Sequence, residues 1–197
     1  IEKFPTVKHL SEATIDEVML LWQGLGYYSR ARNLHVAAKI VMEKFKGIFP
    51  VTFKELKTLK GIGDYTAAAI ASIANNGPVA VLDGNVYRVL SRFFAIYEPV
   101  DIPKNKKIFL KLAENLLLKN SPGTFNQAIM ELGALVCTPK QPKCAECPLE
   151  VKCLAYLSKT VSDFPVKSNK AKQRNRYFYY LIISENEQTI IQKRNEK

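Results

Sequence analysis

All four cysteines of this 197-residue chain lie between positions 137 and 153, and this clustering constrains the fold more than any other feature. Their spacing is Cys137-x6-Cys144-x2-Cys147-x5-Cys153. Four thiolates are the ligand set of a [4Fe–4S] cluster, whereas structural zinc sites usually show two well-separated CxxC pairs. A disulfide scaffold is not expected, because the rest of the chain can build a core without cross-links. The spacing predicts an iron–sulfur cluster in a reducing compartment, with zinc and free thiols as open alternatives.

The charge favours a polyanionic partner. The formal net charge is +11 and the pI is about 9.5, which is typical of chains that bind nucleic acid, although scattered lysines would give the same total. Part of the excess is local, because residues 159–176 carry six basic side chains and one acid, Asp163. That stretch is interpreted first as a solvated linker and second as a phosphate-contacting arm. The chain has no 18-residue apolar run and no secretory signal, so no membrane partner is expected.

The spacing of apolar residues predicts a helical body. The first helix is expected to follow Ser11, with Ile15, Val18, Met19 and Trp22 on one face. Thr52 is expected to cap a short helix, and Asp83 to open another. The remaining predicted helices cover residues 29–45, 65–75, 105–118 and 124–136.

The C-terminal residues differ in character from this body. Residues 177–183 form an aromatic and β-branched run that is typical of a strand. Residues 184–188 resemble a polar turn, and residues 189–191 are a candidate second strand. Since two strands alone are marginal in water, the pattern indicates the start of a second, β-containing domain.

Two glycines one residue apart, Gly61 and Gly63, separate two predicted helices. Such a turn permits close backbone approach, and its N–H groups at the start of a helix can bind a phosphate. The pattern of Gly61, Ile62 and Gly63 is that of a helix-hairpin-helix clamp on a DNA backbone. A plain helix–helix turn is the alternative.

Asp83 follows Leu82 and precedes Gly84 and Asn85. Capping a helix is the commonest role of such an aspartate, and a carboxylate at a helix N-terminus tends to stay ionised. An ionised carboxylate beside a flipped nucleoside could stabilise the positive sugar that forms as the base leaves. The two roles are compatible.

The segment from Gln23 to Asn33 combines glycines, paired tyrosines and arginines. Aromatic side chains such as Tyr27 can wedge into a base stack, and arginines such as Arg30 can hold phosphates. Tyrosines buried at a helix junction are the alternative.

These motifs, in this order, resemble the endonuclease III superfamily of DNA repair enzymes, and more closely its adenine-excising branch, the MutY family. The segment Phe125-Asn126-Gln127-Ala128 adds a fifth match, and the resemblance covers about residues 4–155. It implies an all-α helix-hairpin-helix DNA glycosylase core at residues 1–136 and a [4Fe–4S] cluster loop at residues 137–154. A basic linker at residues 155–176 and the start of a Nudix-like domain at residues 177–197 would follow.

The resemblance also implies hydrolytic removal of adenine that is mispaired with 8-oxoguanine or guanine. The partner would be double-stranded DNA containing that mispair, and the chain would act as a monomer in the bacterial cytoplasm or a eukaryotic nucleus. Endonuclease III-type lyases carry a Schiff-base lysine where this chain has Tyr65, and tyrosine cannot form that imine. Carried over by position, the catalytic residues are Asp83, Tyr65 and Asn85, and the DNA-binding residues are Gly61, Ile62, Gly63, Gln23, Tyr27, Arg30 and Gln127.

One departure from the family concerns its general acid, a glutamate in a Glu-Val-Met-Leu-Gln-Gln segment upstream of everything seen here. Glu17 begins a similar short sequence, but Trp22 and Gln23 after it belong to the next part of the family pattern. Glu17 is therefore interpreted as a solvated helix-surface carboxylate, and impaired excision is expected from the chain. A non-catalytic iron–sulfur DNA-binding protein and an endonuclease III-like glycosylase of other specificity are the alternatives.

Overall fold

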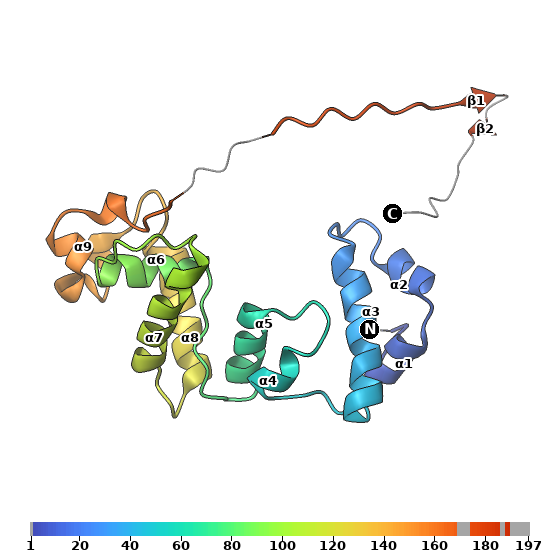
Figure 1. The fold of residues 1–197 in the computed structure, drawn as a ribbon, viewed down its shortest axis with the longest axis horizontal. Helices are drawn as coiled ribbons and strands as arrows, with labels where there is room; N and C mark the ends of the chain where they lie inside the picture. The colour runs from blue at the N-terminus through green and yellow to red at the C-terminus, as the bar shows by residue number, and fades with distance from the viewer. Residues whose placement is uncertain (1, 169–173, 186–187, 190–197) are drawn as a thin grey trace.

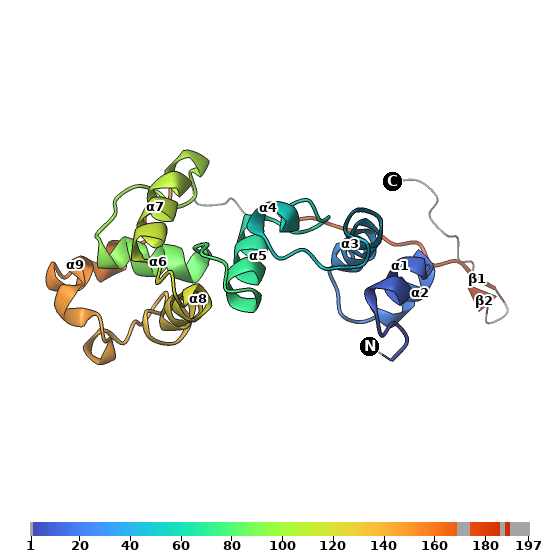
Figure 2. The same cartoon turned by 90° about the horizontal axis from the view of Figure 1, so that it is seen from below.

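The computed structural model describes residues 2–168, 174–185 and 188–189, and its body is built from helices. Figures 1 and 2 show α1 to α3 at one end, α4 and α5 in the middle, and α6 to α9 at the other end. Within the described residues, no helix is both long and apolar enough to span a membrane.

The first group of helices contains α1 (Val7–Glu12), α2 (Ile15–Leu21) and α3 (Ser29–Phe45). The helix predicted from Ile15, Val18 and Met19 is confirmed as α2, but its predicted start is wrong, because Thr14 caps it and Ser11 lies inside α1. The Thr14 side chain accepts a hydrogen bond from the Glu17 amide, and the Glu17 carboxylate accepts one from the Thr14 amide, which makes a capping box. The predicted helix over residues 29–45 is confirmed at both ends.

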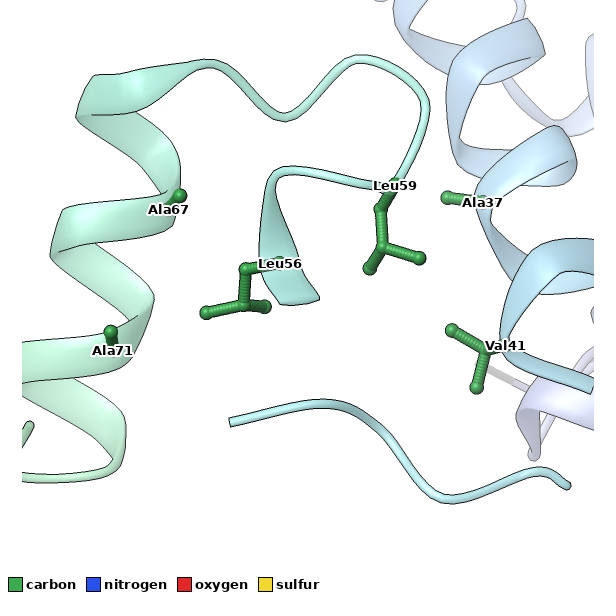
Figure 3. Packing of buried hydrophobic residues seen from close by; sticks show 6 residues of the cluster. All are labelled: Ala37, Val41, Leu56, Leu59, Ala67 and Ala71. Carbon is green, nitrogen blue, oxygen red and sulfur yellow. The ribbon is translucent and has the colours of Figure 1, made fainter. Parts of the chain in front are cut away.

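The middle group contains α4 (Phe53–Leu56), α5 (Asp64–Ala69) and the π-helical turn η1 (Ile70–Ala74). The predicted cap is confirmed, because the Thr52 side chain accepts a hydrogen bond from the Glu55 amide. Figure 3 shows Leu56 and Leu59 between α3 and α5, facing the small side chains of Ala67 and Ala37. Both leucines are buried, so this apolar contact fixes the turn between α4 and α5 on the long helix α3.

The far group contains α6 (Gly84–Phe93), η2 (Pro103–Asn105), α7 (Lys106–Leu116), α8 (Pro122–Glu131) and the π-helical turn η3 (Leu132–Val136). These helices share a second core, in which Phe109 meets the ring of Tyr87 edge to face at 5.0 Å. The cysteine segment packs on this core through short elements: η4 (Cys144–Glu146), η5 (Glu150–Lys152), α9 (Leu154–Leu157) and η6 (Val161–Asp163).

The predicted strand over residues 177–183 is wrong. These residues are extended but unpaired and exposed, and Figure 1 shows them apart from the helical body. The only strand pairing within the described residues joins β1 (Ser184–Glu185) to β2 (Gln188–Thr189), antiparallel. A β-prone run becomes a strand only when a neighbour offers backbone partners, and these described residues have none. Most of the predicted second strand, residues 190–191, lies outside the described residues.

Candidate functional site

The two glycines of the hairpin differ in backbone conformation and in surroundings. Gly61 has a φ of +83°, and a Cβ atom there would lie 2.7 Å from Cβ of Asn33 in α3. Gly63 has an ordinary extended backbone as the N-cap of α5, and a Cβ there would meet open space. Ile62 packs its side chain against the core between α3 and α5. The turn therefore directs its side chain inward and leaves the backbone of Gly63 open to an approaching ligand.

Asp64 opens α5 next to this turn and is paired with two lysines. Its carboxylate contacts the ammonium groups of Lys57, in the turn after α4, and Lys106, at the start of α7. These hydrogen bonds, from Lys106 and then Lys57, lower the pKa of Asp64 from 3.8 to about 2. The pairing connects the hairpin to the far group of helices.

A cavity of about 630 Å³ lies between the hairpin and α7. Tyr65, which is nearly half exposed, lines it together with Leu82, the residue before Asp83. No hydrogen bond joins Tyr65 to Asp83 in the part of the chain that the structure describes. The wall of the cavity combines apolar side chains with four charged ones: Lys57, Asp64, Lys106 and Glu114.

Asp83 is the N-cap of α6, as predicted. Its Oδ1 accepts a hydrogen bond from the Val86 amide at 2.7 Å, and its Oδ2 accepts one from the Asn85 side chain at 3.0 Å. The carboxylate is half-buried, and both oxygens accept donors that fix its orientation. Asn85 therefore lies beside the carboxylate and orients it.

Two buried arginines on α6 continue this network, and the sequence interpretation missed both. Arg88 donates to Oδ1 of Asn85 at 2.8 Å and to the carbonyls of Gly133 and Cys137, each at 2.6 Å. Burial lowers the pKa of the Arg88 guanidinium from its ordinary value. A chain of hydrogen bonds thus runs from Asp83 to the first cysteine. The pair of arginines four residues apart, on the helix that Asp83 opens, was the available signal.

Arg92, one turn further along α6, is almost fully buried and lies against the cysteine segment. Its Nη1 donates to Sγ of Cys137 at 3.3 Å and to the Thr138 carbonyl at 2.8 Å. Its other nitrogens reach the carbonyls of Pro139, Val161 and Phe164 at 3.1 to 3.2 Å. One side chain thus holds two separate stretches of the segment, residues 137–139 and residues 161–164.

All four cysteines are free thiols and line one small cavity of about 30 Å³. Burial raises the pKa of the Cys144 and Cys147 thiols, and the Cys137 thiol adds to this effect. Within the described residues, no three His, Cys, Asp or Glu side chains converge as a single metal ion requires. A four-iron cluster has a different requirement, because each thiolate binds a different iron atom. Four thiols around one cavity fit that donor set.

The loop between α2 and α3 carries Gln23 and Tyr27, Arg30 lies in the first turn of α3, and all three side chains are exposed. Tyr27 is 83% exposed and has a φ of +48°, a left-handed conformation unusual for a side chain of its size. The Arg30 guanidinium lies over the rings of Trp22 and Tyr27, at 5.2 and 5.7 Å. The loop thus presents an aromatic side chain to solvent from a defined backbone.

The prediction that Glu17 is a helix-surface carboxylate is confirmed. It is bound in the capping box, forms an ion pair with Lys3 at 3.4 Å, and its side chain is 44% exposed. The hydrogen bonds from Thr14 and the contact with Lys3 lower its pKa. Figures 1 and 2 place α2, which carries Glu17, and α6, which Asp83 opens, in different end groups of helices.

Gln127 is exposed on α8, whereas its neighbour Asn126 is completely buried. Asn126 accepts a hydrogen bond from the Val81 amide and donates to the Ser72 hydroxyl and the Val79 carbonyl. It ties α8 to η1 and to the segment that leads into Asp83. This structural role was not predicted from the sequence.

One helical chain thus carries a glycine-containing hairpin, a capped aspartate and a four-cysteine segment. The profile of the family described as "HhH-GPD superfamily base excision DNA repair protein" matches residues 1–116. The chain belongs to this superfamily.

Curated relatives give a narrower comparison. The chain is similar to proteins named adenine DNA glycosylase, with 39% identity over all of the chain and 57% of the Buchnera aphidicola (Schizaphis graminum) protein. The human protein of that name is 47% identical over 79% of the chain and 29% of its own length. The chain thus spans little more than half the length of the Buchnera relative, and less than a third of the human one.

Solved structures show the same fold. A thermostable thymine-DNA glycosylase matches with a TM-score of 0.72 and 28% identity, over 80% of this chain and 72% of its own. An endonuclease III structure, solved as a non-covalent DNA complex, matches over the same shares with a TM-score of 0.65 and 23% identity. At that identity the endonuclease III match supports the fold alone.

Proposed function

We propose that this chain is part of an adenine DNA glycosylase that removes adenine opposite 8-oxoguanine or guanine. The observation that carries the proposal is Asp83, a half-buried carboxylate whose two oxygens are held by the Val86 amide and the Asn85 side chain. The relatives at 36–47% identity carry that name, whereas the thymine-DNA glycosylase structure is 28% identical.

In the proposed reaction, the bond between the base and the deoxyribose carbon breaks and the base leaves with the electron pair. The sugar becomes positively charged, and the Asp83 carboxylate stabilises that charge because it is fixed before the reaction begins. Water then adds to the sugar carbon and loses a proton. The base must leave the helical stack first, as in other enzymes that act on bases.

Tyr65 favours hydrolysis over strand cleavage. A lyase needs an amine that forms an imine with the opened sugar, and a phenol cannot supply one. Tyr65 lines the same cavity as Leu82, next to Asp83, and is exposed enough to contact a flipped nucleoside. This observation disfavours the endonuclease III-like alternative.

The cysteines would hold a [4Fe–4S] cluster. When bound, the cluster would cross-link the backbone at Cys137, Cys144, Cys147 and Cys153 and thereby fix the segment between α8 and α9. Arg92 supports this segment from within by donating to Sγ of Cys137 and to surrounding carbonyls. Protein purified without oxygen should be brown and contain about four irons per chain; one zinc and no iron would contradict the proposal.

Glu17 is not the general acid in this proposal. Its carboxylate accepts hydrogen bonds in the capping box and pairs with Lys3, and its helix α2 lies in a different group of helices from α6, which Asp83 opens. Protonation of the leaving adenine typically contributes about 10²–10⁴-fold to such a reaction. The acid is proposed to come from the upstream segment that the MutY family places before the matching region.

The proposal is tested by single-turnover excision on a duplex with one 8-oxoguanine:adenine pair. Two proteins are compared: the 197-residue chain, and a chimera with the N-terminal segment of an adenine DNA glycosylase relative ahead of residue 1. The chimera should excise adenine at least about 100-fold faster than the chain. Glu17→Gln should leave the chimera's rate nearly unchanged. Full activity of the 197-residue chain that is lost on Glu17→Gln would overturn the assignment of the acid.

A further inference from the structure

The guanidinium of Arg30 is engaged with its own loop. Its Nη2 lies 3.3 Å from the Leu25 carbonyl and 3.5 Å from the Gly26 carbonyl, and the Trp22 indole N–H donates to the same Gly26 carbonyl at 3.0 Å. The group also faces the rings of Trp22 and Tyr27. One side chain at the start of α3 therefore touches both the backbone and the aromatic residues of the loop.

The loop needs such a support because its backbone is strained at Tyr27. Gly24 and Gly26 have φ angles of +84° and +64°, and Tyr27, which has a Cβ atom, follows at +48°. A left-handed conformation at a large non-glycine residue persists only when surrounding contacts hold it. A Cβ at either glycine would meet open space, so neighbouring packing does not confine this part of the backbone.

We infer that Arg30 is a positioning residue that holds Tyr27 in place before DNA arrives. The planar guanidinium contacts two carbonyls and two ring faces at once, which fixes the direction in which Tyr27 projects. The use of Tyr27 as a wedge in damaged DNA rests on the proposed function, whereas the positioning itself is a property of the free protein.

The competing role for Arg30 is a plain phosphate contact, as the sequence pattern suggested. Lysine could replace Arg30 in a phosphate contact but not in the positioning of Tyr27. An ammonium supplies the charge that a phosphate needs, but it lacks the planar fork that bonds two carbonyls while stacking on rings. Arg30→Lys therefore separates them, with Arg30→Met as the variant that removes both charge and fork.

The first experiment uses Trp22, the only tryptophan of the chain, as a reporter in the free protein. Loss of the guanidinium from its ring should shift the emission to longer wavelength and increase quenching by acrylamide. We expect both changes in Arg30→Lys and in Arg30→Met. Arg32→Met is the matched control, because Arg32 is exposed on the same helix and its guanidinium lies over no aromatic ring of the described residues. Wild-type emission in Arg30→Met, or in Arg30→Lys, would overturn the inference.

The second experiment measures equilibrium binding to an 8-oxoguanine:adenine duplex and to the matching undamaged duplex. Both Arg30 variants should lose about 5- to 10-fold of the preference for the damaged duplex, on the scale of one or two cation–π contacts. Equal weakening on both duplexes, restored by lysine, would identify a phosphate contact and overturn the positioning role. If the wild-type chain shows no preference, the proposed function fails, while the emission experiment still decides the role of Arg30.

Discussion

Two aspartates, Asp83 and Asp64, stand at the start of helices in different parts of the molecule, and their surroundings differ. Asp83 caps α6, is half-buried, and is held by an amide and by Asn85, with a buried arginine behind it. Asp64 is the first residue of α5 and is held by two lysine ammonium groups at the surface. The first carboxylate is oriented by neutral donors, and the second is neutralised by opposite charges.

This difference separates a reactive group from a structural one. A carboxylate that is oriented but not paired with a cation keeps its charge available for a positive sugar. A carboxylate that already faces two ammonium groups has little negative charge available for another cation. Its contacts instead hold the hairpin against α7. Helix position alone would have given both residues the same role. Each of the following variants tests one side of this comparison.

The largest effect is expected for Asp83→Asn. The amide keeps the size of the side chain and its Oδ1 can still accept from the Val86 amide, but the negative charge is lost. Loss of one preorganised stabilising group typically slows catalysis by about 10²–10³-fold, and excision by the chimera should fall by at least this factor. Duplex binding should change little. Asp64→Asn, assayed in parallel, should keep most of the excision rate; an equal loss in both variants would remove the distinction.

The second effect concerns the network behind Asp83. Arg92 is 3% exposed, and its replacement by methionine would leave the carbonyls of Thr138, Pro139 and Val161 without their charged donor. Because hydrogen bonds to charged groups contribute about 1.5–3 kcal/mol each, Arg92→Met should lower the free energy of unfolding by about 3 kcal/mol or more. Urea denaturation measures the change, and the iron content should fall with it.

Arg176→Met is the control for this variant, since Arg176 is exposed in the C-terminal segment and a surface substitution should stay within about 0.5 kcal/mol. Unchanged stability and iron content in Arg92→Met would show that the cysteine segment is held by other contacts.

Local patterns in the sequence predicted the helices well, because a helix is determined by nearby residues. The helix Ser29–Phe45 and the cap at Asp83 are examples, each with an apolar rhythm or a short polar side chain at the right position. The capping box at Thr14 and Glu17 is also a local pattern, and it would have predicted the start of α2 correctly, whereas Ser11 did not. The family resemblance, rather than local chemistry, supplied the catalytic assignments.

Contacts between distant segments were not predictable in the same way. Arg88 contacts Gly133, and Lys106 contacts Asp64, across more than forty residues of sequence. The periodicity of apolar residues does not indicate such long-range contacts. The strand predicted for residues 177–183 failed for a related reason, since strand formation depends on a partner that local sequence does not reveal.

The third effect compares the two glycines of the hairpin. Gly63→Ala introduces a methyl group into open space with an allowed backbone, so stability should be kept while a phosphate is pushed away from the turn. We expect about 5- to 10-fold weaker binding to all duplexes alike, the size of a lost charge-assisted contact. Gly61→Ala should instead lower stability by about 1–3 kcal/mol, because of the positive φ and the contact with Asn33. Weaker binding confined to mismatched duplexes would argue against a backbone clamp.

The smallest effect is expected for Asp64→Asn, and it depends on pH and salt. Because the pKa of Asp64 is lowered from 3.8 to about 2 by Lys106 and Lys57, the ionised carboxylate stabilises the folded chain above about pH 4. That contribution is lost as the pH falls from about 4 toward 2. The carboxylate is 43% exposed, so solvent screens the pairs and the loss should stay below about 1 kcal/mol. Urea denaturation of both proteins at pH 7 and pH 2.5 should show a difference at pH 7 that shrinks at pH 2.5 and at high salt. A difference that is constant with pH and salt would show that Asp64 does not stabilise the chain through its two lysines.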